Sequence, residues 1–375
     1  MQFRSLMKFA VLVGFASVLS PASASALGDL ARAMRPGEWR VLNQAGDGSG
    51  YTFGNLLVAC NGGDCGDNIL NYADKGMWNP NTREIHFIGK GASGKELKHI
   101  SYSEASNRWA REAKPFWDCS PGEGCFGHGY QHSTIDPATG DVYFRQYNSA
   151  SVYRWIRGGK TWSSLPSGPS LDCCGALEWF PEMQGFVFVN KGQLHQFSPS
   201  QGAWRQLGNR LAMGDYHNVG TYNPVHKVVV FGGGNNGGEY GGARDLHKLD
   251  DAGRVSRISS PPAGVGILQS VFTVDPASGK YLLLTADGRF FEYDVPGDQW
   301  SELGSAGVQA FSSSLPNRIE YRVAVPISTH GVVAFLVTDR SDASSRVLLY
   351  KHAPGPVAPP LDTTPPSPPT GLSVE

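Results

Sequence analysis

The chain has 375 residues, of which 40% are apolar and only 17% charged, and it contains 47 glycines and 25 prolines. This composition is typical of short strands joined by many turns, and it argues against a mainly helical fold. The formal net charge is −1, and it becomes −3 without Arg4 and Lys8 of the predicted leader. Because no basic patch is evident, we do not predict nucleic-acid binding.

Residues 1–26 have the pattern of an export signal. The two basic residues are followed by an apolar run, Phe9–Leu19, and then by the small-residue triplets Ala22-Ser23-Ala24 and Ala24-Ser25-Ala26. Either triplet fits a signal-peptidase cleavage site. The apolar run is short for a membrane span, and no later segment is long and apolar enough. We therefore expect a mature protein that is secreted or periplasmic.

The six cysteines form three local pairs. These are Cys60 with Cys65, Cys119 with Cys125, and Cys173 with Cys174. Pairing within each group closes much shorter loops than any cross-pairing, and export would place the cysteines where disulfides persist. The alternative for the adjacent pair is two buried thiols or a metal pair. The spacings do not match a zinc framework, so we predict neither a metal site nor a cofactor.

The next segment of the chain is a six-fold repeat. Its units are marked by predicted proline turns at Pro80, Pro137, Pro181, Pro224, Pro276 and Pro326. An apolar strand follows each turn, and a third strand carries an aromatic residue or leucine. A fourth strand carries Trp109, Trp162, Trp204 or Trp300, with Val255 in that place in the fourth unit. Four strands per unit at this period predict the blades of a propeller.

The sixth unit has no fourth strand of its own. The missing strand is found near the N-terminus, where Glu38–Leu42 matches Asp298–Leu303 of the fifth unit. We therefore predict an all-β, six-bladed β-propeller of four-stranded blades over residues 27–353, closed by an N-terminal strand that completes the last blade. Closing the ring leaves only short, protected strand edges.

One unit carries a family pattern. The segment Val228–Gly234 is an apolar strand ending in glycines, and Leu246–Leu249 follows as a leucine strand. In this the chain resembles the Kelch family, which implies a β-propeller. The other units lack the glycine pair, so the resemblance is to a divergent Kelch-like propeller.

The C-terminal residues 354–375 are rich in proline and are predicted to form a semi-rigid linker. Within them, Asp362–Val374 resembles the linker and first strand of a bacterial fibronectin type III domain. The segment is too short for that seven-stranded domain, so we expect an incomplete fibronectin-like segment.

The candidate site residues come from the loops that precede the first strands, which also carry the cysteine pairs. In a propeller these loops emerge on one face near the axis. The predicted ligand-binding residues are Trp117, Tyr130, Asn218, Arg318 and Glu320. Aromatic rings stack on sugar faces, and arginine or asparagine binds hydroxyls and carboxylates. The favoured function is therefore binding of an extracellular glycan, either a polysaccharide or a glycoprotein.

Two alternatives stay open, so whether the protein is an enzyme is undecided. The first is a polysaccharide lyase that cleaves a uronate-containing glycan by β-elimination, which needs a base, an acid and a cation for the carboxylate. Its candidates are His128, His132 and His217 as base, Tyr216 and Tyr321 as acid, and Arg318 and Arg322 as cation. The second alternative is an extracellular protein-interaction scaffold, because a propeller fold does not imply one function.

Overall fold

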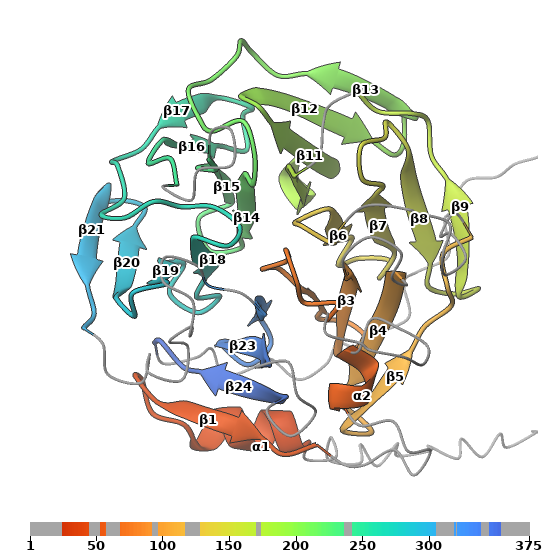
Figure 1. The fold of residues 1–375 in the computed structure, drawn as a ribbon, viewed down its shortest axis with the longest axis vertical. Helices are drawn as coiled ribbons and strands as arrows, with labels where there is room; N and C mark the ends of the chain where they lie inside the picture. Colours follow the sequence, from red (N-terminus) through yellow and green to blue (C-terminus); the bar gives the residue numbers. More distant parts are fainter. Residues whose placement is uncertain are drawn as a thin grey trace, which may run out of the picture.

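The computed structural model contains six four-stranded sheets arranged around a common axis (Figure 1). The structure describes residues 25–44, 53–57, 68–91, 97–116, 128–169, 174–235, 242–304, 319, 321–338 and 345–353. All paired strands within a sheet are antiparallel. The molecule is therefore a six-bladed β-propeller, and the predicted fold class is confirmed.

The blades follow one another round the ring in chain order. Blade 1 is β2 (Met77–Asn79), β3 (Glu84–Lys90), β4 (Leu97–Ser103) and β5 (Arg108–Arg111); blade 2 is β6 (Ser133–Ile135), β7 (Val142–Arg145), β8 (Val152–Ile156) and β9 (Thr161–Ser164); blade 3 is β10 (Ala176–Phe180), β11 (Gly185–Asn190), β12 (Gln193–Ser198) and β13 (Ala203–Gln206). Blade 4 is β14 (Val219–Asn223), β15 (Val228–Gly232), β16 (Leu246–Leu249) and β17 (Val255–Arg257); blade 5 is β18 (Ser270–Val274), β19 (Tyr281–Thr285), β20 (Phe290–Asp294) and β21 (Gln299–Glu302); blade 6 is β22 (Arg322–Ile327), β23 (Val332–Val337), β24 (Arg346–Tyr350) and β1 (Trp39–Leu42).

The first strand of every blade lies next to the axis. Each of these inner strands touches the inner strands of both neighbouring blades, so the six form a closed ring around the axis. All six run in the same direction. We call the end at which they begin the entry face and the end at which they lead into their turns the turn face. The loops that lead into the inner strands lie at the entry face, and the turns between the first and second strands lie at the turn face.

The ring closes through β1, as the sequence predicts. This strand pairs with β24, with Trp39 opposite Tyr350 and Leu42 opposite Val347. The Trp39 ring lies 4.5 Å from that of Tyr350 and 5.2 Å from that of Phe335, measured between centroids. The two ends of the propeller sequence thus share one sheet (Figure 1).

The predicted proline turn is wrong in blade 6. Three of the prolines directly follow an inner strand and two follow it after a single aspartate, but Pro326 lies inside β22, opposite Val333. The turn comes two residues later, where Ser328 occupies the place of the other prolines. Pro326 is tolerated because β22 is an edge strand of its sheet, where a missing N–H can face away from the ladder.

Two short helices, α1 (Ala26–Ala33) and α2 (Phe53–Leu57), were not predicted. Both contribute to the core at the joint between blades 6 and 1, where Leu27 and Leu57 pack in one cluster with Val325. All three side chains are fully buried. The helices therefore cover apolar surface that the closing joint would otherwise leave exposed.

The glycine run of blade 4 is required by its backbone. Gly232, Gly233 and Gly234 all have positive φ, at 130°, 61° and 95°. A Cβ on Gly234 would lie 2.3 Å from the carbonyl oxygen of Tyr216, closer than any side chain allows. This run carries the resemblance to the Kelch family, and membership of that family stays a prediction.

Several predicted features lie outside the described residues. These are residues 1–24 of the leader, the tail from 354 to 375, and the cysteines Cys60, Cys65, Cys119, Cys125 and Cys173. Cys174 is described, and its sulfur is not a free thiol. The three disulfide pairings therefore stay predictions. Within the described part of the chain, no helix is long and apolar enough to cross a membrane.

Candidate ligand-binding cavity

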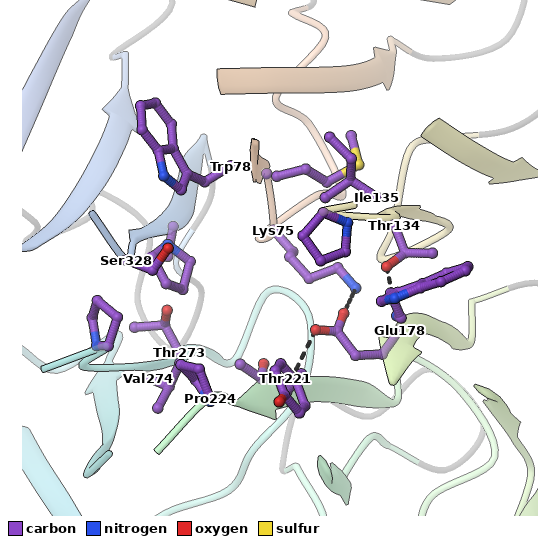
Figure 2. A pocket seen from close by; sticks show the side chains of 18 of the residues that line it. Lys75, Trp78, Thr134, Ile135, Glu178, Thr221, Pro224, Thr273, Val274 and Ser328 are labelled. Atoms are coloured by element: carbon purple, nitrogen blue, oxygen red, sulfur yellow. Dashed lines mark hydrogen bonds and ion pairs between the residues drawn. The ribbon is translucent and has the colours of Figure 1, made fainter. Parts of the chain in front are cut away.

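A cavity of about 260 Å³ lies on the axis at the turn face (Figure 2). All six blades contribute to it, through residues of their inner strands, the turns that follow and, in blade 1, Lys75 and Gly76 just before β2. The cavity therefore exists only because the ring is closed.

The rim of the cavity is apolar. It is lined by the five turn prolines together with Ser328, which takes the equivalent place in blade 6. The prolines are Pro80, Pro137, Pro181, Pro224 and Pro276. A proline ring has no N–H to donate, so these turns offer hydrocarbon to a ligand and few hydrogen-bond donors. The exposed Val225 follows Pro224 and extends this apolar rim in blade 4.

Aromatic rings continue the wall inward from the rim. Trp78, Trp179 and Tyr222 each stand two residues before a turn proline, and all three line the cavity. The Tyr222 hydroxyl donates to Glu182 at 3.1 Å, which holds that ring in place. Aromatic and aliphatic walls with a few polar groups are typical of pockets that bind organic ligands.

The two charged residues that line the cavity are paired with each other. Lys75 Nζ lies 2.6 Å from Glu178 Oε2, and the two side chains are only 8% and 15% exposed. Lys75 also donates to the backbone carbonyl of Leu177, and Glu178 Oε1 accepts from the Tyr222 amide at 2.9 Å. The pair thus links blades 1, 3 and 4 across the axis, and its charge is neutralised inside the protein (Figure 2).

A second polar link crosses the axis beside this pair. Gln131 Nε2 donates to Asp74 Oδ1 at 2.8 Å, and Gln131 Oε1 accepts from the Gly220 amide at 2.8 Å. Asp74 is buried, and its other carboxylate oxygen has no hydrogen-bond partner. Burial raises the pKa of Asp74 to about 7, although the bond from Gln131 and the charge of Lys75 lower it.

The raised pKa predicts an effect of Asp74→Asn that depends on pH. Because the folded pKa lies above the unfolded value of about 3.9, the folded state binds more protons between about pH 4 and 7, and this carboxyl lowers stability as pH rises. Asparagine does not titrate, so the stability of the variant relative to wild type should increase from pH 5 to pH 8. The limit is about 1.4 kcal/mol per pH unit below the folded pKa. Thermal unfolding of both proteins at pH 5, 6, 7 and 8 measures the difference, and a constant difference would contradict the raised pKa.

The predicted site residues that the structure describes lie toward the entry face, and none of them lines this cavity. The His128 ring stacks on Tyr72 at 4.2 Å between centroids, and His217 lies 5.9 Å from Tyr130. His128, Tyr130 and His217 are each less than 10% exposed. The structure thus brings three of the predicted residues, His128, Tyr130 and His217, together with Tyr72 in a packed ring cluster.

Three other predicted residues are bonded to the scaffold. His132 is fully buried, accepts from the Cys174 amide at 3.3 Å, and has a pKa held well below its usual value by burial. Asn218 donates to the carbonyls of Gly214 and Gly233. Arg322 is buried and donates through Nη1 to the carbonyls of Tyr321 and Thr338. Their roles in a ligand site stay predictions.

Of the remaining predicted residues, Tyr216 and Tyr321 are described. Lys191 Nζ lies 5.3 Å from the ring centre of Tyr216, and Tyr321 is buried in the core cluster at the joint between blades 6 and 1. Trp117, Arg318 and Glu320 lie outside the described residues, so their placement is untested. Among the residues that are described, no group of three or more His, Cys, Asp or Glu side chains is arranged to hold a metal ion.

All six inner strands enter through a strained residue. Positive φ angles occur at Tyr72, Tyr130, Cys174, His217, Leu268 and Tyr321. Left-handed backbone is uncommon for residues other than glycine, and at a single position it would suggest a functional constraint. Here it recurs in every blade, one to five residues before the inner strand begins. We therefore attribute it to the turn that feeds each strand onto the axis.

The sequence reasoning missed the cavity residues Lys75, Glu178, Trp179 and Tyr222. A usable signal was present, because an aromatic residue stands two positions before the turn proline in blades 1, 3 and 4. The prolines alone predict turns. Their common position at one mouth of the ring, with the aromatic residues behind them, is the additional signal for a cavity.

The fold and the cavity define a six-bladed β-propeller with an axial pocket walled by apolar groups. No protein-family model matches the chain, and no curated protein matches it. Among solved structures it is similar to a chain of one titled "Crystal structure of Nidogen/Laminin Complex", with a TM-score of 0.44 and 9% identity over 64% of this chain and 82% of that chain.

Proposed function

We propose that this propeller is a protein-interaction scaffold that holds an apolar side chain of its partner in the axial cavity. The observation that carries the proposal is the cavity itself, which is walled by proline and aromatic rings and whose two charged residues, Lys75 and Glu178, already pair with each other. A bulky side chain buried in a pocket is the usual anchor of a protein interface.

The size of the cavity favours a side chain over a larger ligand. Sites for drug-sized molecules usually measure about 300–1,000 Å³, whereas this cavity measures about 260 Å³. A sugar would need several hydrogen-bonding groups turned toward it. Here Thr134 Oγ1 accepts from the Trp179 amide, and Glu178 bonds Lys75 and Tyr222. These polar groups support the wall of the cavity.

The same bonds favour binding over a reaction at this site. A catalytic acid or base needs access to its substrate and a position from which a proton can move. Lys75 and Glu178 are instead held by each other and by the backbone, with most of their surface buried. The cavity walls that surround them are mainly proline, aromatic and aliphatic side chains, with the hydroxyl groups of three threonines and Ser328.

Peptides selected from a random phage-displayed library on the wild-type protein test this proposal. The blocking variant is Ser328→Trp, because Ser328 lies on a partly exposed turn at the rim, where a large ring can fill the mouth. We expect the selected peptides to share one large apolar residue and to bind this variant at least about tenfold more weakly than wild type.

The matched control for this experiment is Ser200→Trp. Ser200 lies on the exposed turn between β12 and β13 and does not line the cavity. This variant should bind the peptides as wild type does, and replacing the shared apolar residue of a peptide by alanine should abolish binding. Peptides that bind Ser328→Trp with unchanged affinity would refute the proposed site.

Glycan binding and β-elimination at the entry face stay separate hypotheses. The ring cluster of Tyr72, His128, Tyr130 and His217 is the feature that bears on them. Incubation with a panel of uronate polysaccharides, with ultraviolet absorbance recording any unsaturated product, distinguishes the two. A product that disappears with His128→Ala or His217→Ala would support the lyase, and retention of a glycan without product would support binding.

A further inference from the structure

Helix α1 joins the two blades at which the ring closes. Leu27, Ala31 and Met34 are buried in a core cluster that also contains residues of blades 1 and 6. At the other end of the helix, Lys351 Nζ donates to the Ala31 carbonyl at 2.8 Å, just beyond β24. The helix is therefore part of the folded domain, although it begins at Ala26, the last residue assigned to the predicted leader.

Ser25 is the residue that starts this helix. Its hydroxyl oxygen accepts from the Gly28 amide at 3.0 Å, and its carbonyl accepts from the Asp29 amide at 2.8 Å. An N-cap serine of this kind typically stabilises a helix by about 1 kcal/mol. The same hydroxyl donates to Glu104 Oε1. Ser25 thus bonds both its own helix and blade 1.

Glu104 is the centre of a buried polar group at this joint. Its side chain is 2% exposed, and it accepts two bonds of 2.7 Å from Arg83 and one of 3.0 Å from His330 of blade 6. Burial alone would raise the pKa of Glu104. The bonds from His330, Arg83 and Ser25 hold that pKa at about 2. Glu104 is therefore a carboxylate at neutral pH, in reach of the start of α1.

The two small-residue triplets of the predicted leader give different mature chains. Cleavage after Ala24 leaves Ser25 as the first residue, whereas cleavage after Ala26 leaves Leu27. The sequence alone does not choose between them. The structure separates them, because only the first cut keeps the helix cap and the bond to Glu104.

We propose that a signal peptidase hydrolyses the Ala24–Ser25 bond and that the new N-terminus of Ser25 becomes part of the joint between blades 6 and 1. One water molecule is consumed, leaving a carboxylate on Ala24 and an ammonium group on Ser25. That ammonium nitrogen is three covalent bonds from the hydroxyl oxygen that contacts Glu104. The carboxylate therefore offsets a positive charge that the start of a helix would otherwise disfavour.

The alternative cut would damage the same joint. It would make Leu27, whose side chain packs in the core cluster of blades 6 and 1, the first residue of the chain. The cut would also remove the cap of α1 and one of the hydrogen-bond donors to Glu104.

Export of the full chain from a bacterial host tests the position of the cut, and the intact mass of the exported protein is the readout. We expect a mature chain that begins at Ser25. A chain that begins at Leu27 would overturn the proposal and leave the export prediction intact. A chain that keeps all its leader residues would overturn both. None of these outcomes affects the proposed axial binding site.

A second measurement tests the role of Ser25 in the folded joint. Chains that begin at Ser25 and at Leu27 are produced without a leader, and their thermal midpoints are compared. We expect the Ser25 chain to unfold at a temperature at least about 2 °C higher. The gap should shrink when both chains also carry Glu104→Gln. Equal midpoints in the wild-type background would overturn the role of Ser25 in the joint.

Discussion

Replacing Trp39 by alanine should lower the free energy of unfolding of the whole propeller by about 3 kcal/mol. The indole packs against Tyr350, Phe335 and Phe290, with ring centres 4.5, 5.2 and 6.2 Å away. Trp39 comes from β1, which supplies the last strand of blade 6 from the other end of the chain. Loss of its contacts therefore weakens the step that closes the ring, and chemical denaturation followed by tryptophan fluorescence measures the effect.

The matched control is Val41→Ala in the same strand. Val41 is 49% exposed, so its truncation should change the free energy of unfolding by less than about 0.5 kcal/mol. A chain that begins at residue 44 removes both α1 and β1. It would leave an edge of β24 without its partner, and we expect it to aggregate in size-exclusion chromatography. A monomeric, folded product would show that closure through β1 is dispensable.

The sequence was sufficient for the fold because a propeller repeats its pattern. The second strand of each blade must be apolar because neighbouring blades cover both of its faces. An apolar run at this position can be found in the sequence of every unit. The closing strand was found because Trp39 repeats the motif around Trp300. Helix α1 was missed because its first residue, Ala26, also fits the end of an export signal. Pro326 was misassigned because proline is allowed in an edge strand as well as in a turn.

The cavity was harder to foresee for a physical reason. Lys75 and Glu178 are 103 residues apart, and nothing local in either segment indicates that they pair across the axis. The predicted site residues come from long loops with unusual side chains, because binding and catalytic residues often lie on loops. The structure instead forms its cavity from the inner strands, whose residues have no unusual sequence pattern. Each of these residues lines the cavity only because the other five blades complete the wall.

The second large effect concerns the ion pair inside the cavity. Replacing Lys75 by methionine should lower the free energy of unfolding by about 3–5 kcal/mol, because it leaves the Glu178 carboxylate largely buried without its cation. Glu178→Gln alone should also destabilise, since Lys75 would keep only the Leu177 carbonyl as a strong acceptor. The double variant Lys75→Met with Glu178→Gln should recover most of the loss. Both charges are then gone, and glutamine can still accept from the Tyr222 amide.

An exposed ion pair provides the matched control for this cycle. Arg254 and Asp250 lie 2.8 Å apart, but the Arg254 side chain is 81% exposed, so Arg254→Met should cost less than about 1 kcal/mol. The double variant also shows whether the ion pair contributes to ligand binding as well as to stability. If the apolar walls hold the partner's side chain, the stable, uncharged double variant should still bind the selected peptides. Loss of binding with stability retained would show that the ligand interacts with the charges of Lys75 and Glu178.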